Sequence, residues 1–310
     1  MKTTVKKGRM SALNIVLFVS LITYALIMIS MFAWSLLQSF RDSWDYTQDG
    51  PLKFDFNAAT FKYYGMVFTD FTRDAVQLDG STATFGIEGM FFNSIMYAVG
   101  ASLAQVFMLV LLSYAVGRFN YKLNGIINSA ILIAMILPVV GSLASEITVA
   151  RSLGIFNTMW GMWILKAHCI SIYFFVLTET FRAIPKEFAD SAGLDGANGV
   201  QIMVTIMLPM VKNVLGTIFL ILFVQYWNDY QTPLVYLESQ PTLIYGFFML
   251  KWVDGEFNFF PGQMAACVVV ILPILIIFIV FQNRFMGNLS MGGLKEINLR
   301  IRRILWQKRS

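Results

Sequence analysis

Hydrophobic residues gather along this chain in long, almost uninterrupted runs that are separated by polar and charged connections. A helix that crosses a membrane needs about 20 predominantly apolar residues in succession. Six runs have roughly that length: Ala12–Phe40, Phe92–Val116, Ile126–Leu143, Met159–Leu177, Met210–Leu237 and Met264–Phe281. The pattern therefore predicts an all-α, polytopic membrane protein with six transmembrane helices.

Overall composition supports this interpretation. Of the 310 residues, 57% are hydrophobic and only 13% are charged. A soluble domain averages about 45–50% apolar and about 25% charged residues. The excess of apolar residues is hard to reconcile with a soluble fold.

The first hydrophobic run has to be distinguished from a secretory signal, because it follows the basic segment "KTTVKKGRM". Its apolar stretch is much longer than the roughly 7–15 residues of a signal core. It ends in "LLQSFRDSW", which has no small-residue cleavage pattern. We therefore expect a retained transmembrane helix.

Basic residues indicate the orientation, since cytoplasmic connections are enriched in lysine and arginine. They cluster in four regions: Lys2, Lys6, Lys7 and Arg9; Arg118 and Lys122; Arg182, Lys186 and Lys212; and Arg284, Lys295, Arg300, Arg302, Arg303, Lys308 and Arg309. Six spans place all four in the cytoplasm only if both termini are cytoplasmic. The predicted organisation is a basic N-terminus (1–11), a first helix (12–40), an extracytoplasmic loop (41–91), a membrane core (92–285) with a cytoplasmic loop (185–209), and a basic tail (286–310).

The net charge of +5 does not require a nucleic-acid partner, because the basic residues lie at predicted cytoplasmic membrane edges. The chain also lacks the glycine-rich phosphate loop of nucleotide-binding proteins. Its single histidine, His168, has no identifiable partners for catalysis, and its two cysteines lie in or beside apolar runs. We therefore expect neither covalent catalysis nor a bound cofactor or metal in this chain.

The predicted cytoplasmic loop, "PKEFADSAGLDGANGVQIMVTIMLP", carries an unusual set of small residues. Residues three and four apart lie on one face of a helix. The small residues of the loop have this spacing; they are Ala189, Ala192, Gly193, Gly196 and Ala197. A face of small residues permits close approach to a partner, although small residues also serve ordinary packing between membrane helices.

The loop also carries turn and helix-start signals. Pro185 suits a first helical turn, where Glu187 and Asp190 complement the positive end of the helix dipole. The sequence "LDGA", with Asp195 and Gly196, has turn character. We expect a short helix, a glycine turn and a second helix near the cytoplasmic surface, with Pro209 opening the fifth span.

The spacing within this loop resembles the signature of the permeases of ATP-binding-cassette (ABC) importers. That signature reads Glu-Ala-Ala, three residues, Gly, nine residues, Ile, one residue and Leu-Pro. Asp190, Ser191 and Ala192 occupy the Glu-Ala-Ala positions, and the remaining positions match at Gly196, Ile206, Leu208 and Pro209. The substitutions of Asp for Glu and Ser for Ala are conservative in charge or size.

The resemblance covers roughly Phe91 to Glu296 and includes four further motifs. They are "NSIMYAVGASLAQVFMLVLLSYAVGRFNYK", "LGIFNT", "WNDYQTPL" and "FQNRFMGNLSMGGLK". Together with the signature loop they are similar to the carbohydrate group of binding-protein-dependent permeases, the group of the smaller maltose-importer permease. Five motifs in the family's order make the resemblance specific.

The resemblance implies a type I ABC importer core in the bacterial plasma (inner) membrane. It implies a coupling helix that inserts into a cleft of an ATPase subunit and includes Ala189, Asp190, Ser191, Ala192, Gly193, Asp195, Gly196, Ala197, Ile206, Leu208 and Pro209. The implied partners are a second permease in a heterodimer, two ATPases that bind ATP and Mg²⁺, an extracytoplasmic solute-binding protein, a carbohydrate and membrane lipid. No nucleic acid is implied.

A polar and aromatic cluster interrupts the fifth apolar run. Polar groups inside membrane spans are costly and often functional. We interpret Trp227, Asn228, Asp229 and Tyr230 as a candidate solute pathway or gate. The alternative is an outer helix end, where Trp and Tyr mark the membrane interface.

Three other functions remain open at this point. The solute can be another polar molecule, such as a glycerol phosphate. A secondary transporter or channel needs no ATPase, but should show internal repeats or polar rings, and the sequence has neither. A membrane enzyme lacks its catalytic residues here. The tail "EINLRIRRILWQKRS" suits an anionic membrane surface, an extra ATPase contact or a disordered segment.

Overall fold

The computed structural model describes residues 12–55, 58–137, 141–252 and 259–282. These residues are mostly helical and fall into two compact units. The first unit comprises the residues up to Asp70 together with Met249–Ile271, and the second comprises Phe71–Phe248 and the residues from Leu272 onward. Each unit is described separately below.

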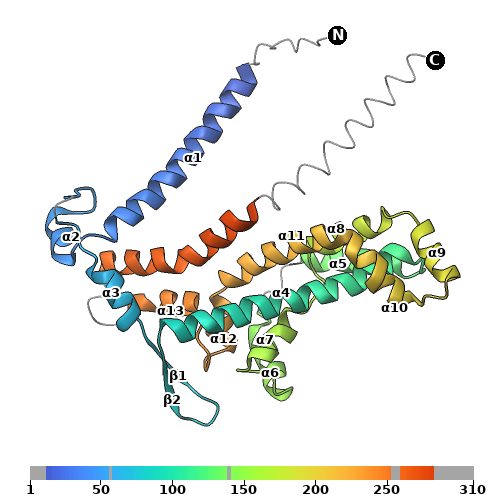
Figure 1. Cartoon of the computed structure of the whole chain (residues 1–310). Helices are drawn as coiled ribbons and strands as arrows, with labels where there is room; N and C mark the ends of the chain where they lie inside the picture. Colours follow the sequence, from blue (N-terminus) through green and yellow to red (C-terminus); the bar gives the residue numbers. More distant parts are fainter. Residues whose placement is uncertain (1–11, 56–57, 138–140, 253–258, 283–310) are drawn as a thin grey trace. The chain divides into compact units, whose positions relative to one another are not determined.

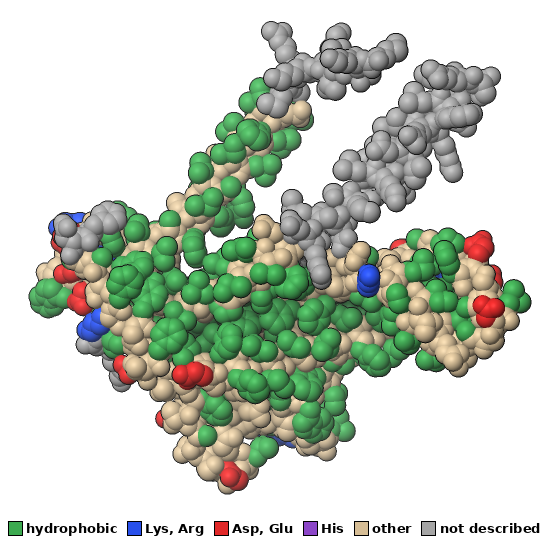
Figure 2. Space-filling model, in the orientation of Figure 1, with side chains coloured by type: hydrophobic (Ala, Val, Ile, Leu, Met, Phe, Trp, Pro, Cys, Tyr) green, Lys and Arg blue, Asp and Glu red, His purple; other side chains and the backbone are tan. Residues whose placement is uncertain are grey.

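The first unit begins with α1 (Ala12–Gln38), which is followed by α2 (Ser43–Asp49) and α3 (Lys62–Thr69). Hydrophobic side chains cover α1, and its most apolar window is entirely exposed (Figure 2). An isolated helix that is apolar all round is stable only in an apolar solvent, because its burial must come from outside the chain. The segment is therefore suited to contact lipid.

A buried arginine organises the turn that follows α1. Arg41 is 4% exposed and donates hydrogen bonds to the carbonyl oxygens of Gly50 (2.7 Å) and Asp45 (2.8 Å). The side-chain amide of Gln38 donates to the carbonyl of Pro51 at 2.8 Å. These bonds close the loop around α2 and order the start of the predicted extracytoplasmic segment.

The second unit begins with a hairpin of β1 (Arg73–Val76) and β2 (Thr82–Phe85), paired antiparallel with Arg73 opposite Phe85. The helices that follow are α4 (Ile87–Arg118), α5 (Asn124–Ile136), α6 (Leu143–Ser152), α7 (Met159–Lys166), α8 (Ile172–Arg182), α9 (Glu187–Leu194), α10 (Gly199–Ile202), a π-turn (Met203–Met207), α11 (Leu208–Trp227), α12 (Gln231–Tyr236) and α13 (Leu243–Met249).

The long helix α4 is the centre of the second unit and packs against α7, α8 and α11 (Figure 1). The contact with α7 depends on Gly100, where an added Cβ would lie 2.1 Å from the indole of Trp163. That indole is held in place because its Nε1 donates to the carbonyl of Met96 at 3.1 Å. A glycine is required here by a close approach between two helices.

Four helices among the described residues are long and apolar enough to cross a membrane: Leu13–Gln38, Ile87–Arg118, Gly199–Trp227 and Phe260–Gln282. They correspond to the first, second, fifth and sixth predicted spans. The chain is therefore a helical protein with several candidate membrane spans. The count of six, and the cytoplasmic placement of both termini, stay predictions.

The third and fourth predicted spans differ from the helices observed. Helix α5 has 13 residues and ends at Ile136, whereas the expected span ran to Leu143. The run Met159–Leu177 is divided into α7 and α8. The division has a local cause, because Ser171 caps α8 by accepting a hydrogen bond from the backbone N–H of Tyr173.

Two further boundaries differ, and one predicted segment is not described. The loop predicted at 41–91 contains α2, α3 and the hairpin, and α4 begins within it at Ile87. The basic tail predicted at 286–310 lies outside the described residues.

Candidate functional site: the coupling loop and the Asp229 cluster

The predicted cytoplasmic loop forms a helix, a glycine turn and a second helix, as the sequence pattern predicted. Helix α9 carries Glu187 and Asp190 in its first turn and ends at Leu194, with Asp195 as its C-cap. Gly196 follows with φ of +86°, in the left-handed region that side chains disfavour. Asn198 then starts α10 with a capping box, in which it exchanges hydrogen bonds of 2.9 Å and 2.8 Å with Gln201.

The face of small residues is open. No residue of α9 is buried, and a Cβ added at Gly193 or Gly196 would meet nothing within 4 Å among the described atoms. Ala189, Ala192 and Ala197 are half-buried. Crowding within the described chain therefore does not explain the missing side chains at Gly193 and Gly196.

Two large apolar side chains project beside this face, and the sequence analysis did not select them. Leu194 is 90% exposed and Phe188 is 49% exposed. Exposed apolar groups close together are typical of a surface that contacts another molecule. Their signal in the sequence was their position on the two sides of the small residues.

The second arm of the loop differs from the prediction, because it does not stop before Pro209. Residues Gly199–Trp227 are helical without a break. A π-turn at Met203–Met207 joins α10 to α11, and the N–H of Leu208 bonds to the carbonyl of Met203. Proline has no N–H for the usual bond to the fourth residue before it, and a wider turn at this point accommodates that loss.

The predicted loop residues therefore lie along this connected structure. Asp190, Ser191 and Ala192 are on α9, Ile206 lies in the half-buried π-turn, and Leu208 and Pro209 begin α11. The connection is direct, since the helix that receives the loop is also a candidate membrane span.

At the other end of α11, Asp229 lies in a network of polar side chains. Its Oδ2 is 3.0 Å from the Nζ of Lys166, and the same oxygen accepts a 2.8 Å hydrogen bond from the Tyr97 hydroxyl. Its Oδ1 accepts from the backbone N–H of Thr232 at 3.0 Å, and Lys166 donates to the Thr232 hydroxyl at 2.7 Å. We call Tyr97, Lys166, Asp229 and Thr232 the Asp229 cluster.

The cluster neutralises a carboxylate that has little access to solvent. The side chains of Lys166 and Asp229 are 21% and 17% exposed. A charge in such a place is costly unless it is paired and hydrogen-bonded. Sequence reasoning selected Asp229 but missed its partner, although a lone lysine within a predicted span was a usable signal.

The remaining residues of the predicted pathway are not brought together at one site. Trp227 is 2% exposed and packs against the rings of Phe91 and Phe223, and its Nε1 has no hydrogen-bond partner among the described residues. Asn228 is exposed and its amide donates to the carbonyl of Val224 at 2.8 Å. Tyr230 stacks on Phe248 with ring centroids 4.2 Å apart.

A row of buried polar side chains on α4 was also missed by sequence reasoning. Gln105 accepts a 2.6 Å hydrogen bond from the Tyr226 hydroxyl, Asn93 donates to the carbonyl of Pro241 at 3.1 Å, and Ser94 accepts from the N–H of Leu243 at 2.7 Å. Each bond joins α4 to a segment more than one hundred residues later. The row fixes how the helices pack.

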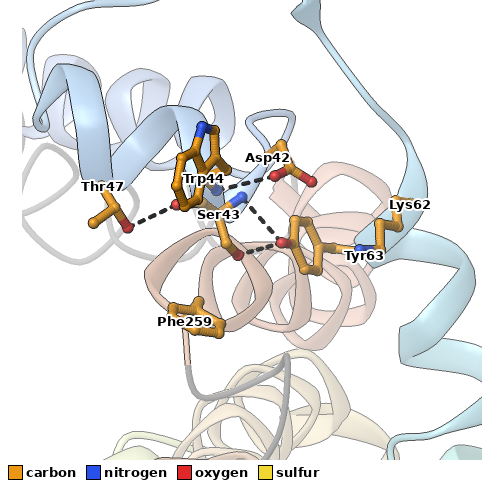
Figure 3. A pocket seen from close by; sticks show the side chains of 7 residues that line it. All are labelled: Asp42, Ser43, Trp44, Thr47, Lys62, Tyr63 and Phe259. Atoms are coloured by element: carbon orange, nitrogen blue, oxygen red, sulfur yellow. Dashed lines mark hydrogen bonds between the residues drawn. The ribbon is translucent and has the colours of Figure 1, made fainter.

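The first unit contains a separate pocket of about 370 Å³ (Figure 3). Its lining residues are Asp42, Ser43, Trp44, Thr47, Lys62, Tyr63 and Phe259. Ser43 and Tyr63 are hydrogen-bonded through their hydroxyls, and Asp42 accepts from the N–H of Trp44. Within the described ranges, no three His, Cys, Asp or Glu side chains gather in a way that could hold a metal ion.

Four long apolar helices, one of which packs on α4 and is joined to a helical loop, indicate a multi-pass membrane protein. Residues 109–289, more than half of the chain, match the family described as "Binding-protein-dependent transport system inner membrane component". The chain belongs to this family.

Two relatives illustrate the family. The chain is 30% identical over 207 residues to the sulfoquinovosyl glycerol transport system permease protein SmoH of Agrobacterium fabrum. The aligned region covers 66% of this chain and 72% of the relative. It is 28% identical over 207 residues to the melibiose/raffinose/stachyose import permease protein MelC of Bacillus subtilis. That aligned region covers 66% of this chain and 75% of the relative.

A solved structure has the same fold. It is the crystal structure of a bacterial ABC transporter involved in the import of the acidic polysaccharide alginate. The alignment covers 90% of this chain and 100% of that chain, with a TM-score of 0.72 and 22% identity.

Proposed function

We propose that this protein is the permease subunit of an ATP-driven carbohydrate importer in the bacterial plasma (inner) membrane. It forms half of the translocation pathway, and a second, different permease forms the other half. The observation that carries the proposal is the exposed α9–Gly196–α10 loop, which has the family's signature spacing and continues without a break into a candidate membrane span. Membership of a binding-protein-dependent transport family supports it.

In this proposal the loop docks on an ATPase subunit. The open face of Ala189, Ala192 and Gly193 lets α9 approach the ATPase closely, and Leu194 supplies an apolar contact. Gly196 sets the angle between the two arms. The proposed coupling segment also includes Asp190, Ser191, Asp195, Ala197, Ile206, Leu208 and Pro209.

The proposed topology has six spans with both termini and the coupling loop in the cytoplasm. Helix α5 and the α7–α8 pair supply the third and fourth crossings, although both are shorter than the four long helices. The basic residues around the loop favour its cytoplasmic side.

The partner subunits supply the chemistry that this chain lacks. Two ATPases bind ATP and Mg²⁺, and their closure moves the coupling loops. An extracytoplasmic binding protein delivers the solute. The carbohydrate class is supported by the relatives SmoH and MelC, which are named as permeases for sulfoquinovosyl glycerol and for melibiose, raffinose and stachyose.

Of the predicted pathway residues Asn228 is exposed, which supports the proposal that its amide meets the solute. Trp227 and Asp229 are largely enclosed, which favours a gate or a packing role over direct solute contact. Tyr230 is engaged with Phe248 and is half-buried.

The test is purification of the native complex and its reconstitution in liposomes. We expect two ATPase copies and a second permease to copurify, and uptake of labelled oligosaccharide to require ATP and the binding protein. Uptake without ATP or a copurifying ATPase would identify a secondary transporter instead. Selective uptake of a glycerol phosphate would replace the carbohydrate assignment and leave the importer class intact.

A further inference from the structure

One continuous helix connects the two candidate sites of the second unit. Gly199–Trp227 contains 29 residues. At the usual rise of an α-helix it is about 43 Å long. The α9 arm of the coupling loop lies at its beginning and α12 at its end (Figure 1). A displacement of the loop therefore acts on one end of this helix, which we call the rod.

The remote end of this rod is attached to the rest of the unit by a charged residue from another helix. Asp229 follows Asn228, the cap of α11, and Lys166 is the last residue of α7. Their 3.0 Å ion pair joins α7 to the short connection between α11 and α12. Tyr97, from α4, donates to the same carboxylate oxygen, so side chains from two helices hold this connection at one atom.

Lys166 contacts the rod at more than one point. Besides the ion pair, its Nζ donates to the Thr232 hydroxyl and lies 5.4 Å from the centre of the Tyr226 ring, a distance at which a cation is attracted to an aromatic face. Tyr226 is on α11 and Thr232 is on α12. Removing the lysine would therefore delete a contact with the end of α11 and a contact with the start of α12 together.

Two other ion pairs of the described chain are much more exposed than the Lys166–Asp229 pair. Lys53–Asp49 has side chains that are 69% and 36% exposed, and Arg182–Glu179 has side chains that are 41% and 68% exposed. Ion pairs exposed to solvent contribute little to the stability of a protein. A buried pair is a poor source of stability compared with apolar packing, but it can specify one arrangement of the elements that it joins.

We propose that Lys166 is a positioning residue for transport. It fixes the end of the Gly199–Trp227 helix to α7 and α4, so that a movement of the coupling loop is delivered to the helix ends around Asp229. The inference rests on the proposed function, because it needs an ATPase that moves the loop. Long-range coupling of this kind requires a rigid element that both sites can bias.

The experiment follows movement at the remote end directly, with ATP and vanadate as the only ligands. Gln231, an exposed residue at the start of α12, is replaced by cysteine in a chain that has Cys169→Ala and Cys267→Ala. In the reconstituted complex, the rate of maleimide labelling at this cysteine is measured before and after the ATPases are trapped with ATP and vanadate.

We expect trapping to change the labelling rate when Lys166 is present. Lys166→Met leaves the Asp229 carboxylate without its cation and should lower the complex yield, so the variants are compared at equal amounts of assembled complex. At equal amounts it should reduce that change by about fivefold or more, the lower end of ordinary coupling between distant sites, while ATP hydrolysis is retained. Lys166→Arg should keep the response. The matched control is Lys53→Met, which removes an exposed lysine pair and should leave the response unchanged.

Other outcomes would overturn the inference. An equal labelling change in Lys166→Met and the parent chain would show that the lysine transmits nothing. If Lys166→Met does not assemble, the double variant Lys166→Asp with Asp229→Lys is tested in its place. A labelling response in the double variant supports the positioning role. No response, or a complex that does not assemble, indicates that the pair is purely structural. Loss of the copurifying ATPase from the parent chain would instead contradict the proposed function.

Discussion

Single residues in the coupling loop are constrained for two different reasons. Gly196 needs its backbone conformation, because φ is +86° there. Gly193 has an ordinary helical conformation and open space around it. The proposed docking of an ATPase accounts for the missing side chain at Gly193, whereas the turn itself accounts for Gly196.

This difference gives a prediction with a built-in comparison. Gly196→Leu should destabilise the turn by about 1–2 kcal/mol, the cost of a left-handed conformation for an L-residue, and abolish ATP-driven uptake. Gly193→Leu introduces no backbone strain, so it should leave the isolated permease folded but weaken ATPase copurification. Membrane insertion is the control for both. Normal ATPase association in Gly193→Leu would contradict docking of the small face.

Neighbouring residues at the end of α11 also differ in kind. Asn228 is exposed and bonds only to the carbonyl of Val224, whereas Asp229 is the centre of an enclosed network. Removal of one partner from a buried ion pair leaves an uncompensated charge, which is strongly destabilising.

We therefore expect Asp229→Asn to lower the yield of the assembled complex, with a loss of stability of about 3–5 kcal/mol. Asn228→Leu should leave the yield unchanged and lower uptake, if its amide meets the solute. Thermal unfolding and uptake are measured on the same preparations. Normal uptake in Asn228→Leu would remove this residue from the pathway, and normal yield in Asp229→Asn would contradict the structural role of the cluster.

At the scale of elements, the second unit depends on how closely other helices approach α4. The α4–α7 contact includes Gly100, where an added Cβ would collide with the fixed indole of Trp163. Gly216 in α11 provides the contrast, because an added Cβ there meets nothing within 4 Å.

Alanine at these two glycines should have opposite effects. Gly100→Ala forces α4 and α7 apart, and overpacking of this kind costs about 1–3 kcal/mol. Gly216→Ala should be neutral or stabilise by up to about 1 kcal/mol, because alanine favours the helix. The measurement is the thermal unfolding of the detergent-solubilised complex. Equal unfolding temperatures for the two variants would show that the close contact is unimportant.

The same scale shows why some helices could not be read from the sequence. The run Met159–Leu177 is apolar enough to look like one span, but the backbone needs only Ser171 as a cap to restart a helix. The continuity of α10 with α11 was hidden for the opposite reason. Pro209 is a usual sign of a helix start, and a π-turn lets the helix pass through it.

At the scale of the whole molecule, topology determines which side each segment faces. The segment around α2 is predicted to be extracytoplasmic and the coupling loop cytoplasmic. Both segments contain exposed positions, at Thr47 in α2 and Leu194 in α9, that a membrane-impermeant reagent can reach.

We expect cysteines introduced at these two positions to be labelled from opposite sides of the membrane. Thr47→Cys should react in intact cells, whereas Leu194→Cys should react only after the membrane is opened. The background carries Cys169→Ala and Cys267→Ala. Labelling of both from the same side would contradict an arrangement in which an odd number of spans separates these segments.

The sequence by itself determined the class of the protein and the form of its coupling loop. Run length and charge bias are local quantities, and the physics of a bilayer makes them sufficient to predict a helical membrane protein. The signature spacing and the left-handed glycine are local as well, so the helix–turn–helix at Gly196 was predictable. The four longest spans followed from the same signals.

Only the tertiary structure decided which distant side chains meet. Lys166 precedes Asp229 by 63 positions and Tyr97 precedes it by 132, yet both contact the same carboxylate oxygen of Asp229. Nothing in a periodic pattern specifies such a pairing, because it depends on how α4, α7 and α11 pack. A buried charge must find its partner in space, and for Asp229 the packing of helices supplied a partner that the sequence did not identify.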